Sequence, residues 1–197
     1  MNKTELIAAI RTELRDTDEN NYFWSDAEID QAIAWAVMEY STSCPIEQRT
    51  DLPTTEGSDE LDISGLEGLI RVKSVEYPIG YRPPYYQHFR YWAGHLQLPI
   101  VGDGRNARVS WLKKHTVTAQ SSTIPPEHDH IIVLGAAVHL AWSASVSLIE
   151  RLNLSGRYGT QGFRLWAQRR YTEYLKKLKQ VAQSNRVQGT IFYTEDE

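Results

Sequence analysis

The sequence predicts an α+β fold: a four-helix bundle with a small β-rich insertion between helices two and three and an extended C-terminal tail. Two observations predict the helices and the insertion. Apolar residues recur at helical spacing before residue 46 and again over 126–184. The intervening stretch 69–117 is rich in β-branched and aromatic residues and is interrupted by turn-forming residues. The tail is expected because a short β-prone run follows Gly189.

Two helices are expected at the N-terminus. Over residues 3–16 the apolar positions are spaced three and four apart, as in an amphipathic helix; they are Leu6, Ile7, Ile10 and Leu14. A second helix is predicted to begin after Ser25, because Ser25 as N-cap and Glu28 three residues later form a capping box. It is expected to end near Ser43, ahead of Pro45.

The insertion begins with a predicted loop and continues with strands. Residues 47–64 are rich in Thr, Pro, Gly and acidic residues, which is typical of loops. Strand-forming residues then dominate around Ile70 to Tyr77, Phe89 to Trp92 and Arg108 to Leu112. Turn residues separate these runs, so a small β module is expected.

Two further helices follow the insertion. The third, expected over about Pro126–Leu152, is apolar on most sides and should be the central buried helix. Gly156, Gly159 and Gly162 are expected to break it, and the fourth helix should run from about Gly162 to Ser184. The predicted domains are 1–46 plus 122–188 for the helices, 47–121 for the β-rich insertion and 189–197 for the tail.

Composition limits the classes of function. The chain has 197 residues, of which 41% are hydrophobic, and a formal net charge of −4, which argues against nucleic-acid binding as its main role. Cys44 is its one cysteine, so no internal disulfide can form and synthesis in a reducing cytoplasm is expected. The run Ile131–Ile149 contains polar residues and is interpreted as a buried helix and not as a membrane span.

Basic residues concentrate on the fourth predicted helix, while acidic residues dominate elsewhere. The basic set is Arg164, Arg169, Arg170, Lys176, Lys177 and Lys179. Such a face can meet an acidic surface on another subunit or contact DNA. It can also be an ordinary solvated face that keeps a helix soluble, and the sequence leaves the three interpretations open.

No local signature of catalysis or of cofactor binding is present. The sequence contains no Gly-x-Ser-x-Gly, His-Glu-x-x-His, P-loop or dinucleotide motif. His128 and His130 would point about 200° apart on a helix, so with His139 they do not form a metal site. We therefore expect no catalytic residues, no metal and no cofactor, and predict that the protein is not an enzyme.

Three local patterns resemble the head-to-tail adaptor, or head-completion, proteins of tailed bacteriophages. They are Leu14-Arg15-Asp16 leading to Tyr22–Ile29, the segment Glu67–Pro78 with sequence EGLIRVKSVEYP, and Ile124-Pro125-Pro126-Glu127 opening an Ala-rich helix. The resemblance spans most of the chain. The β insertion of roughly fifty residues departs from the smallest, all-helical adaptors.

The resemblance implies a place in the neck of the virion, after assembly in the cytoplasm of the bacterial host. It implies a ring of about a dozen copies, a dodecamer, under the portal protein, with DNA passing non-specifically through its lumen. The implied partners are the portal protein, other copies of the chain and a downstream tail, stopper or nozzle protein, with no membrane.

Two further sites are predicted. The tail residues Thr190, Ile191, Phe192, Tyr193 and Thr194 have no strand partner nearby in sequence, so we expect them to dock onto the portal or a neighbouring subunit by strand addition. Packing on the chain's own β module is the alternative. Tyr85, Tyr86 and Trp92 are a candidate interface of the insertion if their rings are exposed. The alternative is that alternate residues of this aromatic run form the core of the module. Exposed rings would favour a second function, a carbohydrate- or ligand-binding phage tail component.

Overall fold

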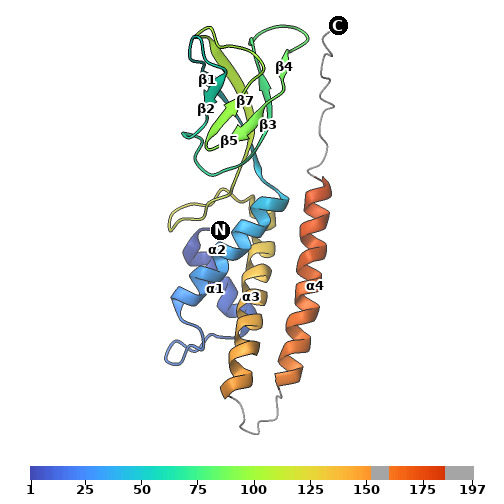
Figure 1. Cartoon of the computed structure of the whole chain (residues 1–197). Helices are drawn as coiled ribbons and strands as arrows, with labels where there is room; N and C mark the ends of the chain where they lie inside the picture. Colours follow the sequence, from blue (N-terminus) through green and yellow to red (C-terminus); the bar gives the residue numbers. More distant parts are fainter. Residues whose placement is uncertain (152–159, 185–197) are drawn as a thin grey trace. The chain divides into compact units, whose positions relative to one another are not determined.

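The computed structural model describes residues 1–151 and 160–184, with side chains described for 1–144 and 165–184. Two compact units are present (Figure 1). One contains Met1–Cys44 and the described part of 115–184, and it is helical. The other is Pro45–Lys114 and consists of strands. This mixture of helices and antiparallel sheets confirms the predicted α+β class.

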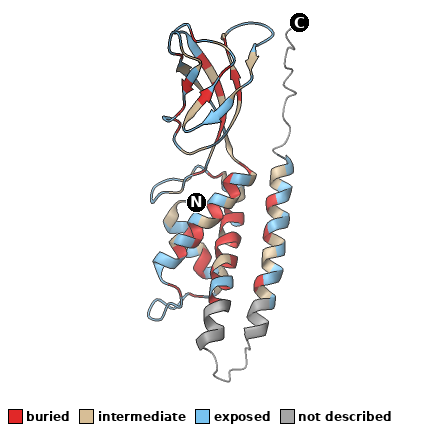
Figure 2. Ribbon diagram, viewed as in Figure 1, coloured by how far each residue is buried: buried red, intermediate tan, exposed pale blue. Residues whose placement is uncertain are grey.

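The helical unit is organised around one helix. Its elements are α1 (Lys3–Leu14), α2 (Asp26–Ser43), the 3-10 turn η1 (Pro126–His128), α3 (Asp129–Arg151) and α4 (Thr160–Ser184). Helix α3 packs against α1, α2 and α4, which agrees with its predicted central position. Figure 2 shows buried residues concentrated on α3 and on the sides of α1 and α2 that face it.

The ends of the N-terminal helices follow from local chemistry. The predicted capping box of α2 is confirmed, because the side chains and backbones of Ser25 and Glu28 are hydrogen-bonded to each other. Helix α1 ends at Leu14, two residues earlier than expected, because Arg15 takes a left-handed conformation at φ 57° and closes the last turn. Helix α4 begins at Thr160, two residues before the start expected near Gly162, while Gly156 and Gly159 lie outside the described residues.

The β unit consists of two antiparallel sheets. Their strands are β1 (Ile46–Pro53), β2 (Glu60–Asp62), β3 (Leu69–Glu76), β4 (Tyr86–Gln87), β5 (Arg90–Trp92), β6 (His95–Gln97) and β7 (Asn106–Lys113). The strand orders are β1-β7-β3-β4 and β2-β6-β5. Buried residues from both sheets, including Leu61, Val75, Leu96 and Val109, form one core.

The loop predicted over 47–64 is wrong, because β1 and β2 lie there. All eight residues of β1 pair with β7, whose residues are about sixty positions away in sequence. Strand β1 is an edge strand, and none of its side chains is fully buried. Its sequence therefore does not need the alternation of apolar and polar residues that is typical of a strand with one buried face. Its composition resembles a loop, and only the long-range backbone pairing makes it a strand.

A buried histidine connects the two chain segments through which the helical unit continues into the β unit, one at the end of α2 and one after β7. The backbone N–H of His115 donates to Ser41 Oγ at 2.9 Å, and His115 Nε2 lies 2.9 Å from the carbonyl oxygen of Cys44. Its Nδ1 lies 3.0 Å from the carbonyl oxygen of Thr123. Burial lowers the pKa of His115. The two passages are thus fixed side by side within the helical unit.

The α3–α4 contact depends on one glycine. Tyr174 of α4 is fully buried, and its ring lies directly over Gly135 of α3. A Cβ at Gly135 would lie 2.7 Å from Tyr174 Cε2 and 2.8 Å from Cζ, closer than any normal contact. The aromatic ring is rigid, so the helices themselves would have to move apart.

We expect Gly135→Ala to lower the free energy of unfolding of the helical unit by about 1–3 kcal/mol, the usual cost of overpacking a core. Denaturant unfolding followed by circular dichroism at the helix band measures this. Gly65→Ala is the matched control, because no atom lies within 4 Å of a Cβ added there. Equal stability of Gly135→Ala and wild type would contradict the proposed packing constraint.

Candidate interaction surfaces

A buried ion pair organises the connection between α1 and α2. Arg11 is buried, and its Nη1 donates to Asp16 Oδ2 at 2.7 Å. Its Nη2 donates to the carbonyl oxygen of Trp24 at 3.1 Å and to Asp26 Oδ1 at 2.6 Å. In turn, Asp16 accepts the backbone N–H groups of Phe23 and Trp24 at 2.7 and 3.3 Å. Both charges are therefore satisfied, and the chain between the helices is held at several points.

The same network leaves two aromatic rings on the surface. The ring of Tyr22 lies 3.5 Å from the Arg11 guanidinium carbon, a cation–π contact, and remains 41% exposed. Phe23 is 59% exposed and touches Trp24 edge-on at 4.6 Å. Asp18 and Glu19 precede them in the chain and are also exposed. We call Tyr22 and Phe23 the aromatic knob.

The predicted basic face of α4 divides into two parts. Arg170 binds Glu13 of α1 and donates to Glu173 at 2.8 Å, and Lys177 lies 3.6 Å from Glu173. These cations belong to contacts within the helical unit. The remaining described members, Arg169, Lys176 and Lys179, are exposed and have no acidic partner in the described part of the chain. Arg164 lies in α4, but its side chain is outside the described set.

An aromatic groove of about 300 Å³ lies among α2, α3 and α4. It is lined by Trp35 of α2, Val138, His139 and Trp142 of α3, and Tyr171 of α4. The Trp35 and His139 rings are stacked with centroids 4.8 Å apart, and Trp142 is 48% exposed. Burial lowers the pKa of His139, so the groove favours the neutral imidazole. Sequence periodicity did not reveal this groove, because its lining comes from three helices.

The aromatic residues proposed for the insertion are mainly on its surface. Trp92 is 79% exposed and Tyr85 44% exposed, while Tyr86 is partly buried in β4. The rings of Tyr81 and Tyr85 meet edge-on with centroids 5.2 Å apart. The interpretation of Tyr85 and Trp92 as module core is therefore wrong. Trp92 is exposed because β5 lies at the edge of its three-stranded sheet.

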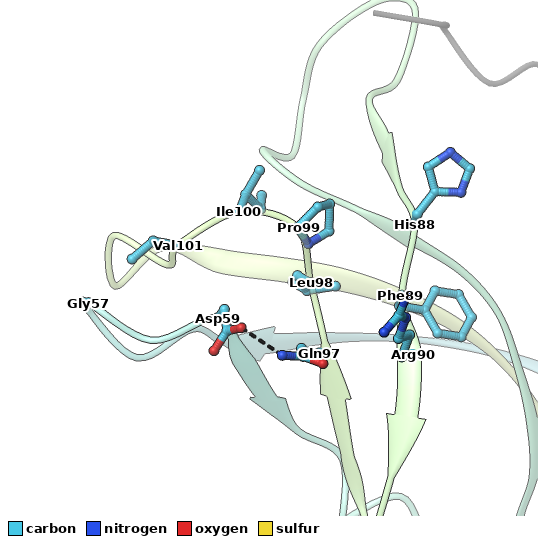
Figure 3. A pocket seen from close by; sticks show the side chains of 10 residues that line it. All are labelled: Gly57, Asp59, His88, Phe89, Arg90, Gln97, Leu98, Pro99, Ile100 and Val101. Atoms are coloured by element: carbon cyan, nitrogen blue, oxygen red, sulfur yellow. Dashed lines mark hydrogen bonds between the residues drawn. The ribbon is translucent and has the colours of Figure 1, made fainter.

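A cavity of about 680 Å³ lies at one end of this sheet (Figure 3). Polar side chains on its wall include Asp59, Arg90 and Gln97, and Gln97 Nε2 donates to Asp59 Oδ2 at 3.0 Å. Apolar wall comes from Phe89 and the segment 98–101. The cavity offers hydrogen-bonding groups and apolar surface.

The histidines singled out in the sequence occupy separate environments. His128 Nδ1 lies 2.6 Å from the Tyr40 hydroxyl, His139 stacks on Trp35, and His130 is exposed. No group of three or more His, Cys, Asp or Glu residues suited to a metal ion occurs among the described residues.

No helix in the described ranges is long and apolar enough to cross a membrane. The tail residues Thr190–Thr194 lie outside the described residues.

A family model described as SU10 adaptor protein matches residues 1–191. The chain belongs to the SU10 adaptor protein family. The resemblance to phage head-to-tail adaptors is thereby confirmed. No curated protein matches the chain. Among solved structures, a chain of "Neck of empty GTA particle computed with C6 symmetry" matches with 14% identity, 83% of this chain and 87% of that chain covered, and a TM-score of 0.28.

We expect the stability of the helical unit to depend on pH through His139. Burial lowers the pKa of His139 in the folded state, whereas the unfolded chain has the ordinary histidine pKa of about 6.5. The folded state is therefore destabilised by protonation of the unfolded chain as the pH falls below about 6.5, and this loss is absent at higher pH. Replacement by phenylalanine keeps an aromatic ring on Trp35 and removes the titrating group. His139→Phe should therefore reduce the loss of stability between pH 7.5 and 5.5 by at most ~1.4 kcal/mol per pH unit.

Urea unfolding of both proteins at the two pH values measures this difference. His115 is unchanged in the variant, so part of the pH dependence should persist. The same pH dependence in His139→Phe and wild type would contradict the prediction.

Proposed function

We propose that the protein is a structural adaptor of the phage neck that forms a ring under the portal and connects the DNA-filled head to the tail. In this proposal the four helices form the adaptor bundle and DNA passes through the lumen of the ring. The observation that supports it best is the family match over residues 1–191. We further propose that the protein is not an enzyme, in keeping with a role that depends on assembly.

The charge distribution favours a lumen through which DNA passes without being held. The formal net charge is −4, and half of the predicted basic face is engaged or undescribed, which leaves Arg169, Lys176 and Lys179 on the outer face of α4. We propose that these cations contact an acidic surface of another protein subunit.

The proposed partners are the portal protein, neighbouring copies of the chain and a downstream tail, stopper or nozzle protein. Docking by Thr190–Thr194 remains part of the proposal. Strand β1 ends its sheet, so its outer edge presents unpaired backbone groups that a strand from a neighbour's tail can join. An edge of eight residues is long enough to pair with the whole of that segment.

Mixing the full chain with its cognate portal protein tests the proposal. Negative-stain images should show an added ring of adaptor density on the portal. A chain truncated before Gly189 should bind portal more weakly, because the docking strand is removed. Absence of any complex with full-length chain would contradict the adaptor function, whereas equal binding by the truncated chain would contradict only the docking of the tail.

A second candidate function is favoured by the exposed rings of the β unit. In the three-stranded sheet, Asp62, His95 and Trp92 lie in one cross-strand row. An exposed indole beside polar side chains is able to stack on a sugar ring while they bind its hydroxyls. By this hypothesis the protein is a carbohydrate- or ligand-binding tail component.

If the second hypothesis holds, glycan-array binding by the full chain should disappear in Trp92→Ala and in Tyr85→Ala. Both side chains are exposed, so neither change should lower stability by more than about 0.5 kcal/mol. Phe23→Ala, an exposed aromatic change in the other unit, is the control. No glycan binding by wild type, together with ring formation on the portal, would exclude this candidate.

A further inference from the structure

We infer that Glu39 makes the contact between α2 and α4 sensitive to pH, so that the contact is tight when its carboxyl is neutral and weaker when it is charged. The inference goes beyond the proposed function and does not depend on it. It rests on two polar groups, Glu39 Oε2 of α2 and the Tyr174 hydroxyl of α4. Both atoms are buried, and neither has a hydrogen-bond partner.

Glu39 lies on the side of α2 that faces α4. It follows Trp35 by four residues, so the two side chains are neighbours on one face of the helix. The rings of Trp35 and Tyr174 have centroids 6.1 Å apart, which places this face of α2 against α4. Trp35 packs against the hydrophobic core that includes Tyr174 and Leu178. The Glu39 carboxyl is therefore set beside an apolar contact.

The surroundings of Glu39 favour its neutral form. Burial withdraws the carboxyl from water and raises the pKa of Glu39, because a charged group loses more solvation than a neutral one. The Tyr174 hydroxyl interacts with the carboxylate and offsets this effect only in part. The folded helical unit thus binds a proton at Glu39 more tightly than the unfolded chain does.

Packing holds the Tyr174 hydroxyl where it is. The side chain is fully buried, and a Cβ added at Gly135 of α3 would lie 2.8 Å from its Cζ and 3.1 Å from its hydroxyl oxygen. The hydroxyl is close enough to Glu39 that the carboxylate raises the pKa of Tyr174. It nevertheless lies outside normal hydrogen-bond geometry. A buried carboxylate without a full hydrogen bond destabilises the packed helices.

No described charged group compensates the Glu39 carboxylate. The titratable side chains of α3 and α4 that face this part of α2 are His128, His139, Tyr171 and Tyr174. Charged residues of the neighbouring helices are paired elsewhere: Lys3 and Arg11 of α1 with Asp30 and Asp26, and Arg170 and Lys177 of α4 with Glu173. The cost of ionising Glu39 is therefore carried by the contact between α2 and α4.

The direction of the pH effect follows from the raised pKa. A carboxyl of this kind contributes stability that is complete below its unfolded pKa of 4.5 and is lost as the pH rises through the folded pKa. His115 and His139 act in the opposite direction, since burial lowers their pKa. Because α4 carries the exposed cations Lys176 and Lys179, the pH sets how firmly this candidate contact surface is held.

Hydrogen exchange of the α4 amides in the full chain tests the inference. Glu39→Gln imitates the neutral carboxyl in size and cannot ionise. At pH 7.5 the amides of 165–184 should exchange at least about threefold more slowly in Glu39→Gln than in wild type, since one unit of pKa shift corresponds to tenfold. At pH 4.5 the difference should shrink, because wild-type Glu39 is then mostly neutral. Comparison at one pH cancels the histidines, which both proteins share.

Glu19→Gln is the matched control. It removes the same charge from an exposed position of the helical unit. Its α4 amides should exchange as in wild type at both pH values. Slower exchange in both variants at pH 7.5 would reflect net charge alone and would overturn the role of Glu39.

Tyr174→Phe is an independent arm, because it keeps the ring over Gly135 and removes the hydroxyl. The hydroxyl favours the carboxylate, so its loss should enlarge the weakening of α4 between pH 4.5 and 7.5, after correction for intrinsic exchange rates. The enlargement should be absent when Glu39→Gln is also present. Equal or faster exchange of Glu39→Gln relative to wild type at pH 7.5 would overturn the inference.

Discussion

The buried pair of Arg11 and Asp16 is the constraint on which the rest of the helical unit's functional surface depends. Arg11 binds Asp16, Asp26 and the carbonyl oxygen of Trp24, so one guanidinium joins the end of α1 to the beginning of α2. Isolating either charge in this setting costs about 3–5 kcal/mol, so the connection has few alternatives to its observed path. That path buries Trp24 and exposes Phe23. The ion pair thus determines that Phe23, and not Trp24, is exposed on the surface between α1 and α2.

Helix α3 organises the packing of the other three helices. It packs against α1, α2 and α4, and close approach to α4 is possible because Gly135 leaves room for Tyr174. The same packing places Trp35, His139, Trp142 and Tyr171 around one groove. The β unit is attached through the two chain passages that His115 holds together.

Local chemistry explains which elements could be predicted. Ser25 and Glu28 form their capping box within one turn, and the apolar stripe of α1 repeats within a few residues, so both are readable without the fold. Strand β1 was missed because its stabilising hydrogen bonds go to β7, across about sixty residues. The basic residues of α4 were found, but sequence could not show that Arg170 and Lys177 are engaged with Glu13 and Glu173.

By itself, the sequence determined the α+β class, the helices and their order, and the resemblance to phage adaptors, because these depend on periodicity, capping and short motifs. The tertiary structure alone decided which cations on α4 are available, that Trp92 and Tyr85 are exposed, and that residues of three helices form a groove. Those properties depend on contacts between residues far apart in the chain. Neither spacing nor composition encodes the distance between such residues, so a functional surface becomes visible only after the elements have packed.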